Sequence, residues 1–467
     1  MKSQVKKRIV NGAGARTLCR AVVCLATFLC SSMASADDWP TYMYDNARMG
    51  VTTESLDVST LNQSWVYTSP APPRPAFSGP APWDPQHGST SEYGTGVYPI
   101  PPARDFDTAF FVTVVGDSVY FGSSVTDSVH CLNIASGAPK WIYTTDGPVR
   151  FPPSYHNDKL YLGSDDGYVH CINASDGSLV WKYSPAAADG KALRRIGNNA
   201  KAVPLWPIRT GAAVHDGKVY FAASMTPWDN CYLCSVDAET GAEVFRVEPV
   251  GNARFRENMK YLTPMGAILV SPSKIYLAQG RHCPWAYDRQ TGKTLGPLQV
   301  TDHAAVHEYN ADGGTYCLLT PDYQRLISGR SGLYTQTETL REFNADTFAY
   351  YPGSNTYAAR MVISDSRAYV TKITSVEAIN RTNGQSLWST TGLDYAPYVL
   401  IKAGDLLFVG GAEKVVAYDS ANGSEVWSKT VSGRVRGLTA ANGHLFASTD
   451  SGFIYAFGAT PRTLAQR

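Results

Sequence analysis

The chain is poor in charge, and the two signs nearly cancel. Only 17% of its 467 residues are Asp, Glu, Lys or Arg, with 41 basic and 40 acidic side chains. A nucleic-acid binder needs a basic surface that displaces counterions, so this balance argues against one. Apolar residues make up 44% and aromatic residues 12%, which is too apolar for a disordered chain. We therefore expect a folded protein that binds no nucleic acid.

Long apolar runs are also scarce. The run from Ala21 to Cys30 is much shorter than the ~20 residues that span a bilayer. Six basic residues and no acidic one accompany it, and Ala34-Ser35-Ala36 follows. This order of basic, apolar and small residues predicts a secretory signal peptide over residues 1–36, cleaved after Ala36. A membrane anchor is the alternative.

The segment that follows the predicted signal peptide is mildly acidic. It keeps 35 basic and 40 acidic residues, because all six charges of the signal are positive. No later run is long and apolar enough to cross a membrane, and the bulky residues before Cys30 disfavour lipidation there. We expect residues 37–467 to form one exported monomeric domain, in the periplasm or outside the cell.

Cysteine is rare as well, with nine in the chain and six after residue 36. Cys231-Tyr232-Leu233-Cys234 is followed by Ser235 and not by His, so we expect no c-type haem. An even number of cysteines in an oxidising compartment permits disulfides. Cys231 and Cys234 would lie ~10 Å apart on one strand, too far for a bridge unless a turn separates them. Each could instead pair elsewhere, and Cys283 is a possible partner; Cys317 is unassigned.

The most informative feature is an internal repeat. A small residue, an apolar residue and Asp or Asn are followed by a Gly turn and, four residues after the Gly, usually by Trp. The clearest copies run from Cys131 to Trp141, Cys171 to Trp181, Ala378 to Trp388 and Ala417 to Trp427. Two copies differ at the last position, which is Phe245 in one and Gly296 in the other. Cys131 and Cys171 stand where other copies have Ala, which predicts buried thiols acting as small residues.

Each position of the repeat has a physical reason. Asp or Asn can bond the backbone two residues on, and Gly supplies the positive φ that closes a turn. The aromatic residue opens the next strand and covers the neighbouring unit. These structural positions are Trp65, Trp141, Trp181, Phe245, Trp388 and Trp427, with Gly137, Gly177, Gly241, Gly292, Gly384 and Gly423.

The spacing of about 40 residues between repeats predicts an all-β propeller with four-stranded antiparallel blades. Outer strands are expected near residues 65, 141, 181, 245, 296, 345, 388 and 427. This gives eight blades, with seven as the alternative. The strand around Trp65 has no blade before it, and the last unit, Leu438–Phe457, has no outer strand. We expect these two to pair, so that strands from both termini close the ring and leave no open sheet edge.

Two insertions interrupt the rhythm. Residues 68–107 hold ten prolines between Pro70 and Pro102, which predicts an irregular, partly polyproline connection. Residues 183–208 lengthen one connection between blades and carry several basic residues. Long loops on such a fold lie on a rim, where function is usually found.

The repeat resembles that of the PQQ-like, or quinoprotein-type, β-propeller family, over roughly residues 38 to 458. The opening Asp38-Trp39-Pro40-Thr41-Tyr42, followed by Asp45-Asn46-Ala47-Arg48-Met49-Gly50, is similar to the N-terminal segment of many exported members. Asp127-Ser128-Val129, Asp146-Gly147-Pro148-Val149-Arg150-Phe151 and Trp206-Pro207-Ile208-Arg209 are similar to stretches of bacterial PQQ-binding-like repeat proteins.

The resemblance implies a fold more sharply than an activity. The family includes quinoprotein dehydrogenases, a barrel-assembly scaffold protein and members of unassigned role. By resemblance alone, PQQ held by Ca²⁺ is the possible cofactor. The adjacent-cysteine pair that stacks on PQQ in methanol-type dehydrogenases is absent here.

Two stretches have a composition typical of metal sites, but we do not predict a site at either. His303 and His307 have the spacing of helical metal ligands, but no third ligand is placed and the region reads as a loop. We therefore predict no metal site. Asp165-Asp166-Gly167 reads as a hairpin turn with solvated carboxylates.

The arginines form the candidate binding site. Arg150 lies 11 residues before Tyr161, and Arg209 lies 11 before Tyr220, in matching strands. Both should stand where an innermost strand begins, at the channel mouth. Arg434 and Arg436 have nearly the same offset, Arg360 fits it more loosely, and Arg194, Arg195 and Trp206 come from the insertion that feeds Arg209.

We expect these groups to form a positive funnel for an anionic or polyhydroxylated small ligand, since guanidinium binds carboxylate bidentately. The alternative is that each arginine pairs with a nearby carboxylate for structural reasons. We identify no catalytic residue, and we expect a ligand-binding or protein-interaction scaffold. The alternatives are a PQQ-dependent dehydrogenase of alcohols or sugars, and an envelope assembly scaffold that binds an unknown protein partner by strand addition.

Overall fold

The computed structural model describes residues 37–76, 89–90, 97–98, 107–198, 201–224, 231–248, 264, 266–278, 284–296, 316–330, 339–347 and 356–458. All of these belong to the compact unit Ser35–Arg467. The predicted signal peptide, His303, His307 and Cys283 lie outside the described residues. Among the described residues, no helix is long and apolar enough to cross a membrane.

Nearly all of the regular structure is antiparallel β-sheet. Six sheets have four strands each: β5(Val112–Val115), β6(Ser118–Ser123), β7(Ser128–Asn133) and β8(Pro139–Thr144); β9(Ser154–His156), β10(Lys159–Gly163), β11(Val169–Asn173) and β12(Leu179–Tyr183); β15(Ala213–His215), β16(Lys218–Ala223), β17(Tyr232–Asp237) and β18(Glu243–Val247); β19(Leu269–Val270), β20(Lys274–Leu277), β21(Trp285–Asp288) and β22(Thr294–Gly296); β23(Tyr316–Leu319), β24(Arg325–Arg330), β25(Thr339–Asn344) and β26(Thr356–Tyr357); β27(Arg360–Ser364), β28(Arg367–Lys372), β29(Ser375–Asn380) and β30(Ser386–Thr391).

A seventh sheet joins the two ends of the fold. Its strands, in spatial order, are β1(Val51–Thr52), β31(Pro397–Ala403), β32(Leu406–Asp419), β33(Glu425–Ala441), β34(His444–Thr449), β35(Phe453–Gly458) and β2(Asn62–Thr68). The first half of β33 pairs with β32 and its second half pairs with β34, so one strand serves two neighbouring units. The predicted four-stranded antiparallel sheets are therefore present, and the number eight stays a prediction.

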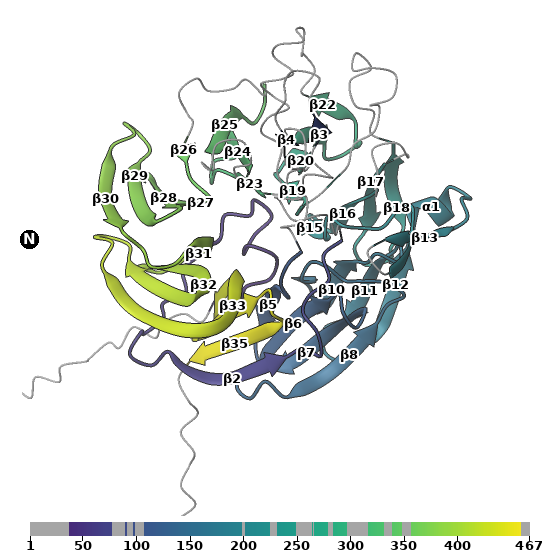
Figure 1. Cartoon of the computed structure of the whole chain (residues 1–467). Helices are drawn as coiled ribbons and strands as arrows, with labels where there is room; N and C mark the ends of the chain where they lie inside the picture. Colours follow the sequence, from purple (N-terminus) through teal and green to yellow (C-terminus); the bar gives the residue numbers. More distant parts are fainter. Residues whose placement is uncertain are drawn as a thin grey trace, which may run out of the picture. The chain divides into compact units, whose positions relative to one another are not determined.

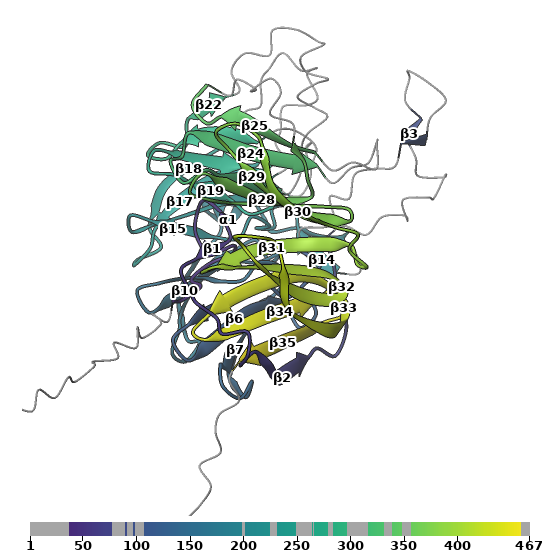
Figure 2. The ribbon, with the colours of Figure 1, turned by 90° about the vertical axis from the view of Figure 1, so that its left-hand side faces the viewer.

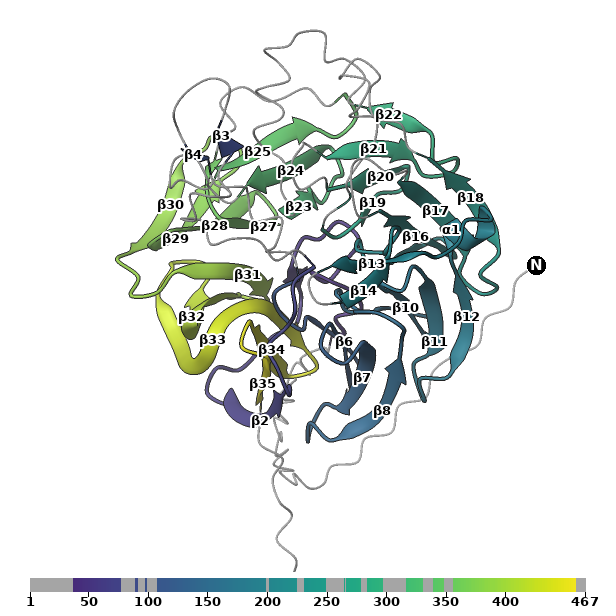
Figure 3. The ribbon, with the colours of Figure 1, turned by 45° about the vertical axis from the view of Figure 1, so that its right-hand side comes forward.

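The sheets follow one another around a common centre, with the first strand of each innermost (Figures 1 and 3). Innermost strands contact their neighbours from β5 through β9, β15, β19 and β23, and again from β27 through β31 and β33 back to β5. The sheets of β23 and β27 share one apolar cluster. The core thus lies between neighbouring sheets, as in a propeller.

Strands from the two termini close the ring, as the sequence predicts. β2 pairs antiparallel with β35, and Trp65 stands opposite Ala456. The two strands lie side by side in Figures 1 and 2. This pairing gives the last unit its outer strand from the N-terminal part of the chain.

The repeat's aromatic residue locks one unit onto the next. Trp141 stands opposite the small residue Cys131 and packs on Gly177 of the next unit, whose φ is +73°. Its indole N–H donates to the carbonyl oxygen of Ala174, 3.1 Å away. Trp65, Trp181 and Trp388 pack in the same way on Gly137, Gly241 and Gly423, and Phe245 packs on Gly292.

One predicted outer strand is wrong. Residue 345 follows the third strand β25 of its sheet, and the outer strand is β26, about ten residues later. This unit carries neither the Gly turn nor the Trp. Its outer strand could therefore be placed only from the distance between the neighbouring repeats.

A segment before β2 runs through the middle of the ring (Figure 3). We call Asp37–Glu54 the N-terminal strap. It bonds or pairs with innermost strands of six sheets, through Trp39 to Val114, Pro40 to Tyr155, Asn46 to Val214 and Val270, Ala47 to Leu319, and β1 to β31. The chain itself therefore occupies much of the channel that a ring of sheets leaves at its centre.

The smaller elements belong to the insertions. The four-residue helix α1(Pro185–Ala188) and the hairpin β13(Arg195–Asn198) with β14(Lys201–Pro204) lie in the segment 183–208. The two-residue strands β3(Ser89–Thr90) and β4(Val97–Tyr98) pair within the proline-rich insertion. Cys131, Cys171, Cys231, Cys234 and Cys317 are all buried free thiols.

Candidate functional site

Arg150 and Arg209 converge on one buried carboxylate, Asp165. Each arginine lies four residues before an innermost strand, β9 or β15, as their equal offset from Tyr161 and Tyr220 predicts. Arg150 donates to Asp165 Oδ2 through Nε at 2.9 Å and Nη2 at 2.7 Å. Arg209 donates through Nε to Oδ1 at 3.0 Å and through Nη2 to Oδ2 at 2.8 Å.

These ion pairs are shielded from water. The side chain of Asp165 is 0% exposed, and those of Arg150 and Arg209 are 3% and 1% exposed. Burial alone would raise the pKa of Asp165, but the two guanidinium groups outweigh it and lower the pKa to about 2. The carboxylate therefore stays charged, and both arginines are engaged inside the protein.

The expectation that Asp165 and Asp166 are solvated turn carboxylates is wrong, since both are buried. Their turn joins β10 to β11, and the insertion 183–208 covers it. A Cβ at Gly167 would meet Pro204 Cγ at 3.1 Å and the Trp206 carbonyl oxygen at 3.4 Å. An isolated hairpin turn would face water, and the covering loop removes that water.

The same cluster fixes the base of the proline-rich insertion. Arg150 Nη1 donates to Asp107 Oδ2 at 2.5 Å and to the Arg74 carbonyl oxygen at 2.7 Å. Ala76 N donates to the same Asp107 oxygen at 2.7 Å. Burial raises the pKa of Asp107, although Arg150 opposes this. The first and last described parts of the insertion therefore meet at one point.

The second insertion reaches the cluster from the other side. Arg209 Nη2 donates to Asn198 Oδ1 at 2.8 Å, which ties the inserted hairpin to Asp165. Arg195 donates to the carbonyl oxygen of Asp146 at 2.9 Å, and Lys201 pairs with Asp127 at 2.8 Å. The hairpin is thus anchored over loops of the two preceding units.

The structure does not bring every predicted residue to this cluster. Arg194 is exposed on the insertion. Trp206 is buried against strands of the two neighbouring sheets, with its ring centroid 6.0 Å from that of Tyr232 on β17. The Lys191 ammonium lies 5.2 Å from the Trp206 ring centroid.

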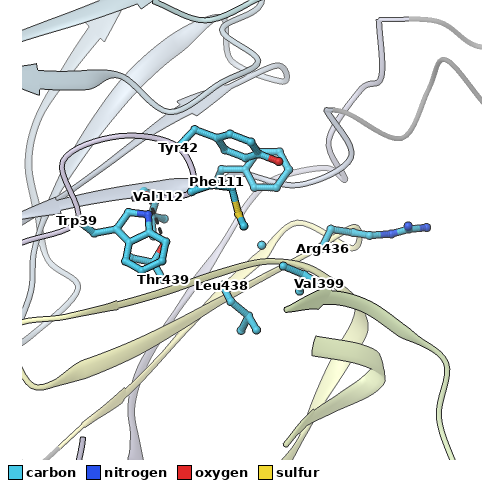
Figure 4. A pocket seen from close by; sticks show the side chains of 10 residues that line it. Trp39, Tyr42, Phe111, Val112, Val399, Arg436, Leu438 and Thr439 are labelled. Carbon is cyan, nitrogen blue, oxygen red and sulfur yellow. Dashed lines mark hydrogen bonds between the residues drawn. The ribbon is translucent and has the colours of Figure 1, made fainter. Parts of the chain in front are cut away.

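Arg434 and Arg436 lie apart from the cluster, beside the beginning of the inner half of β33. The side chain of Arg434 is 57% exposed, with Asp450 3.5 Å away. The guanidinium of Arg436 stacks on Tyr398, 4.3 Å from the ring centroid. The stem of Arg436 lines a small hollow with Trp39, Tyr42 and Phe111, and its guanidinium points away from that hollow (Figure 4).

Arg360 adds a third cation of the same kind, at the first residue of the innermost strand β27. Its guanidinium lies 5.1 Å from the ring centroid of Tyr316 and donates to the Ala359 carbonyl oxygen at 2.7 Å. Among the described residues, Arg360 forms no ion pair with a carboxylate. The stacking tyrosines Tyr316 and Tyr398 were missed from the sequence, because nothing in the spacing of the repeat marks them.

The described residues do not fit a Ca²⁺-held quinone cofactor. Across the described ranges, no group of three or more His, Cys, Asp or Glu side chains lies close enough to hold a metal ion. Arg150 and Arg209 are already paired with Asp165, so they are not available to a quinone carboxylate. The strap also runs through the centre of the ring, where such a cofactor would need space. We therefore derive no reaction step through such a cofactor.

The comparisons with known proteins agree on the fold. The family model described as "Outer membrane protein assembly factor BamB" matches residues 91–203 and 372–464. The chain carries PQQ-like β-propeller repeats. No curated protein sequence matches it significantly.

Three solved structures show how far this PQQ-like propeller is similar to known folds. A europium-containing methanol dehydrogenase is 12% identical, with 90% of this chain and 98% of that chain covered and a TM-score of 0.56. The quinohemoprotein alcohol dehydrogenase from Comamonas testosteroni is 13% identical over 92% and 82%, with a TM-score of 0.52. The computationally designed Ika8 protein is 14% identical over 76% and 98%, with a TM-score of 0.54. At these identities the likeness shows the fold alone.

Proposed function

We propose that this propeller is an exported binding module that takes a carboxylate-bearing ligand, or an acidic segment of a protein, at one mouth of its ring. Arg360, Arg434 and Arg436 are the contact groups. The observation that supports this is the contrast between two sets of arginines. Arg150 and Arg209 are neutralised by buried aspartates, whereas Arg360 is stacked on Tyr316 at the beginning of an innermost strand and forms no ion pair with a described carboxylate.

At Arg360, stacking on Tyr316 leaves the edge of the guanidinium available. The donors of the group lie in its plane, so a tyrosine below that plane orients the fork without consuming it. A carboxylate can then bind bidentately, and such charge-assisted bonds are the stronger ones. Arg434, which is more than half exposed, would add long-range attraction for an anion.

The test is a titration with PQQ, which carries three carboxylates, and with citrate, each with and without Ca²⁺. We expect both anions to bind the purified protein, and R360A and R436A each to weaken binding about tenfold or more, since bonds to charged groups contribute about 1.5–3 kcal/mol. Arg246→Ala, which breaks a surface ion pair elsewhere, is the control.

The same experiment separates the binding module from a quinoprotein dehydrogenase. Dye reduction by the PQQ- and Ca²⁺-loaded protein in the presence of ethanol or glucose would show that the protein is an enzyme. If R360A and R436A bind the anions as tightly as the unmutated protein, the arginines do not contact the ligand.

The family model supports a second candidate, a scaffold in outer-membrane protein assembly. The outer strands β8, β12 and β18 of three successive units carry exposed apolar side chains, namely Ile142, Leu179, Val180 and Val244. A partner's strand added to such an edge would bury them. Photo-crosslinkers at Ile142 and Val244 should then capture an outer-membrane assembly component, whereas crosslinkers at exposed Ser386 of β30 should not.

A further inference from the structure

Glu54, at the end of the N-terminal strap, is a buried carboxylate that no described cation pairs with. It is 2% exposed. Oε1 accepts a hydrogen bond from Gly443 N at 2.7 Å, and Oε2 accepts one from Asp37 N at 2.6 Å. Within the described residues, no Lys, Arg or His side chain forms an ion pair with it. A buried charge is costly unless it is paired, so this carboxylate calls for a positive partner.

Several hydrogen bonds other than the one to Glu54 hold Asp37 at that position. Its carbonyl oxygen accepts from Asn442 N at 3.2 Å. Its Oδ2 accepts from Tyr44 OH at 3.0 Å and from Thr52 Oγ1 at 2.6 Å. The backbone nitrogen of Asp37 is therefore fixed against Glu54 by contacts that do not depend on Glu54.

Asp37 is also the residue that follows the predicted cleavage site Ala34-Ser35-Ala36. We infer that cleavage after Ala36 converts the Asp37 nitrogen from an amide into an α-ammonium that forms a buried ion pair with Glu54. A signal-peptide protease supplies the cleavage. Water breaks the Ala36–Asp37 bond, its oxygen joins the Ala36 carbonyl carbon, and the freed amine takes up a proton.

The ion pair makes the docking of the strap depend on processing. Before cleavage, Glu54 receives two neutral N–H donors. After cleavage, the donor at 2.6 Å carries a full positive charge, and the charged hydrogen bond is stronger. The strap pairs with innermost strands of six sheets, so a stronger anchor at its first residue holds the segment that threads the ring.

The experiment compares two chains that differ only in where they begin. One begins at Asp37 and the other at Ser31, and both are released from a fusion by a protease that leaves no extra residue. Hydrogen exchange is followed at strap amides with internal acceptors, such as Trp39, whose partner is Val114 O, and Gly50, whose partner is Met43 O. We expect exchange to be about tenfold or more slower in the chain that begins at Asp37.

Glu54→Gln isolates the ion pair, with exposed Glu425→Gln as the matched control. E54Q should abolish the difference between the two chains, and E425Q should keep it. Mass spectrometry of the exported protein should find Asp37 at the N-terminus. Equal exchange in the two chains, a difference that survives in E54Q, or a mature N-terminus other than Asp37 would overturn the inference, and the two unmutated chains decide it even if E54Q does not fold.

Discussion

At the scale of single residues, the aspartate that two arginines share is the most consequential group of the interior. Asp165 keeps its charge because Arg150 and Arg209 surround it. Arg150 also bonds to Asp107 of the proline-rich insertion, and Arg209 bonds to Asn198 of the insertion 183–208. A buried pair adds little stability over an apolar replacement, but removing one partner leaves an uncompensated charge.

The first prediction follows from that asymmetry. Asp165→Asn or Arg209→Ala should lower the free energy of unfolding by about 3–5 kcal/mol. Lys140→Ala is the control, because its partner Asp117 is 71% exposed and such pairs contribute about 0–1 kcal/mol. Urea unfolding followed by tryptophan fluorescence measures both. A loss below about 1 kcal/mol for D165N would show that the cluster is not a structural ion pair.

A second residue-scale prediction concerns pH. His130 is buried against Phe121, and this burial lowers its pKa to about 4. In the unfolded chain a histidine titrates near ~6.5. Between these values the unfolded state binds more protons, so stability falls as the pH is lowered from about 6.5 to about 4.

His130→Gln, which retains a hydrogen-bonding group for Ser128 and Thr126 but does not titrate there, should flatten the dependence in this window. Thermal unfolding midpoints measured at several pH values test it, with His156→Gln as the control at a less buried site. An unchanged slope in H130Q would mean that another group causes the loss of stability in acid.

Only part of this cluster could be predicted from the sequence. The equal offsets of Arg150 and Arg209 from Tyr161 and Tyr220 placed both at equivalent positions, because strand order repeats from unit to unit. Their partners could not be predicted. Asp107 comes from the end of an insertion 43 residues before Arg150 in the chain, and Asp165 is buried only because a second insertion covers its turn.

At the scale of the repeating element, the glycine of each turn has two distinct roles. Gly423 and Gly384 occupy the same place in their units and have nearly the same φ, +76° and +72°. A Cβ at Gly423 would meet the Trp388 ring, with its nearest contact at 2.4 Å, whereas a Cβ at Gly384 would meet no described residue within 4 Å. The two positions separate backbone strain from packing.

We therefore predict that Gly384→Ala costs about 1–2 kcal/mol, the strain of a left-handed non-glycine residue. Gly423→Ala should cost about 1–3 kcal/mol more, because the indole must move from its site. The ellipticity of the tryptophans in the near ultraviolet should change in G423A alone. Equal losses of unfolding free energy in the two variants would show that the Trp388 ring can move aside at no cost.

The repeat also explains what could be predicted about the elements. Wherever Trp and Gly recur, as at Trp141 and Gly177, strand positions follow from local chemistry. The sheet of β23 to β26 lacks both, and there the expected outer strand was about ten residues too early. The N-terminal strap was not anticipated as a channel segment, since its hydrogen bonds go to strands as distant as β31 and no short-range pattern reports them.

At the scale of the whole molecule, closure depends on one pairing between distant parts of the chain. β2 stands between solvent and β35, and Trp65, Ile454 and Phe457 are buried where these strands meet. Without β35, β2 would lose its partner and β34 would expose a row of unpaired backbone groups.

Truncation tests this closure. A chain that ends at Gly452, and so lacks β35, should unfold at a much lower temperature than one that ends at Gly458, and it should self-associate through the exposed edges. Calorimetry and size-exclusion chromatography measure the two effects. A monomeric Gly452 chain with an unchanged unfolding temperature would show that the ring is stable while open.

The strap and the closing pair also set an order in time. A ribosome makes the strap and β2 first, but their partners β31 and β35 come at the other end of the chain. The pairing of β1 with β31 and of β2 with β35 must therefore wait through nearly the whole of synthesis. Contacts so distant in sequence are slow to form, and unpaired strand edges in the interval invite aggregation. A chain of this design benefits from remaining unfolded until its last strand is available.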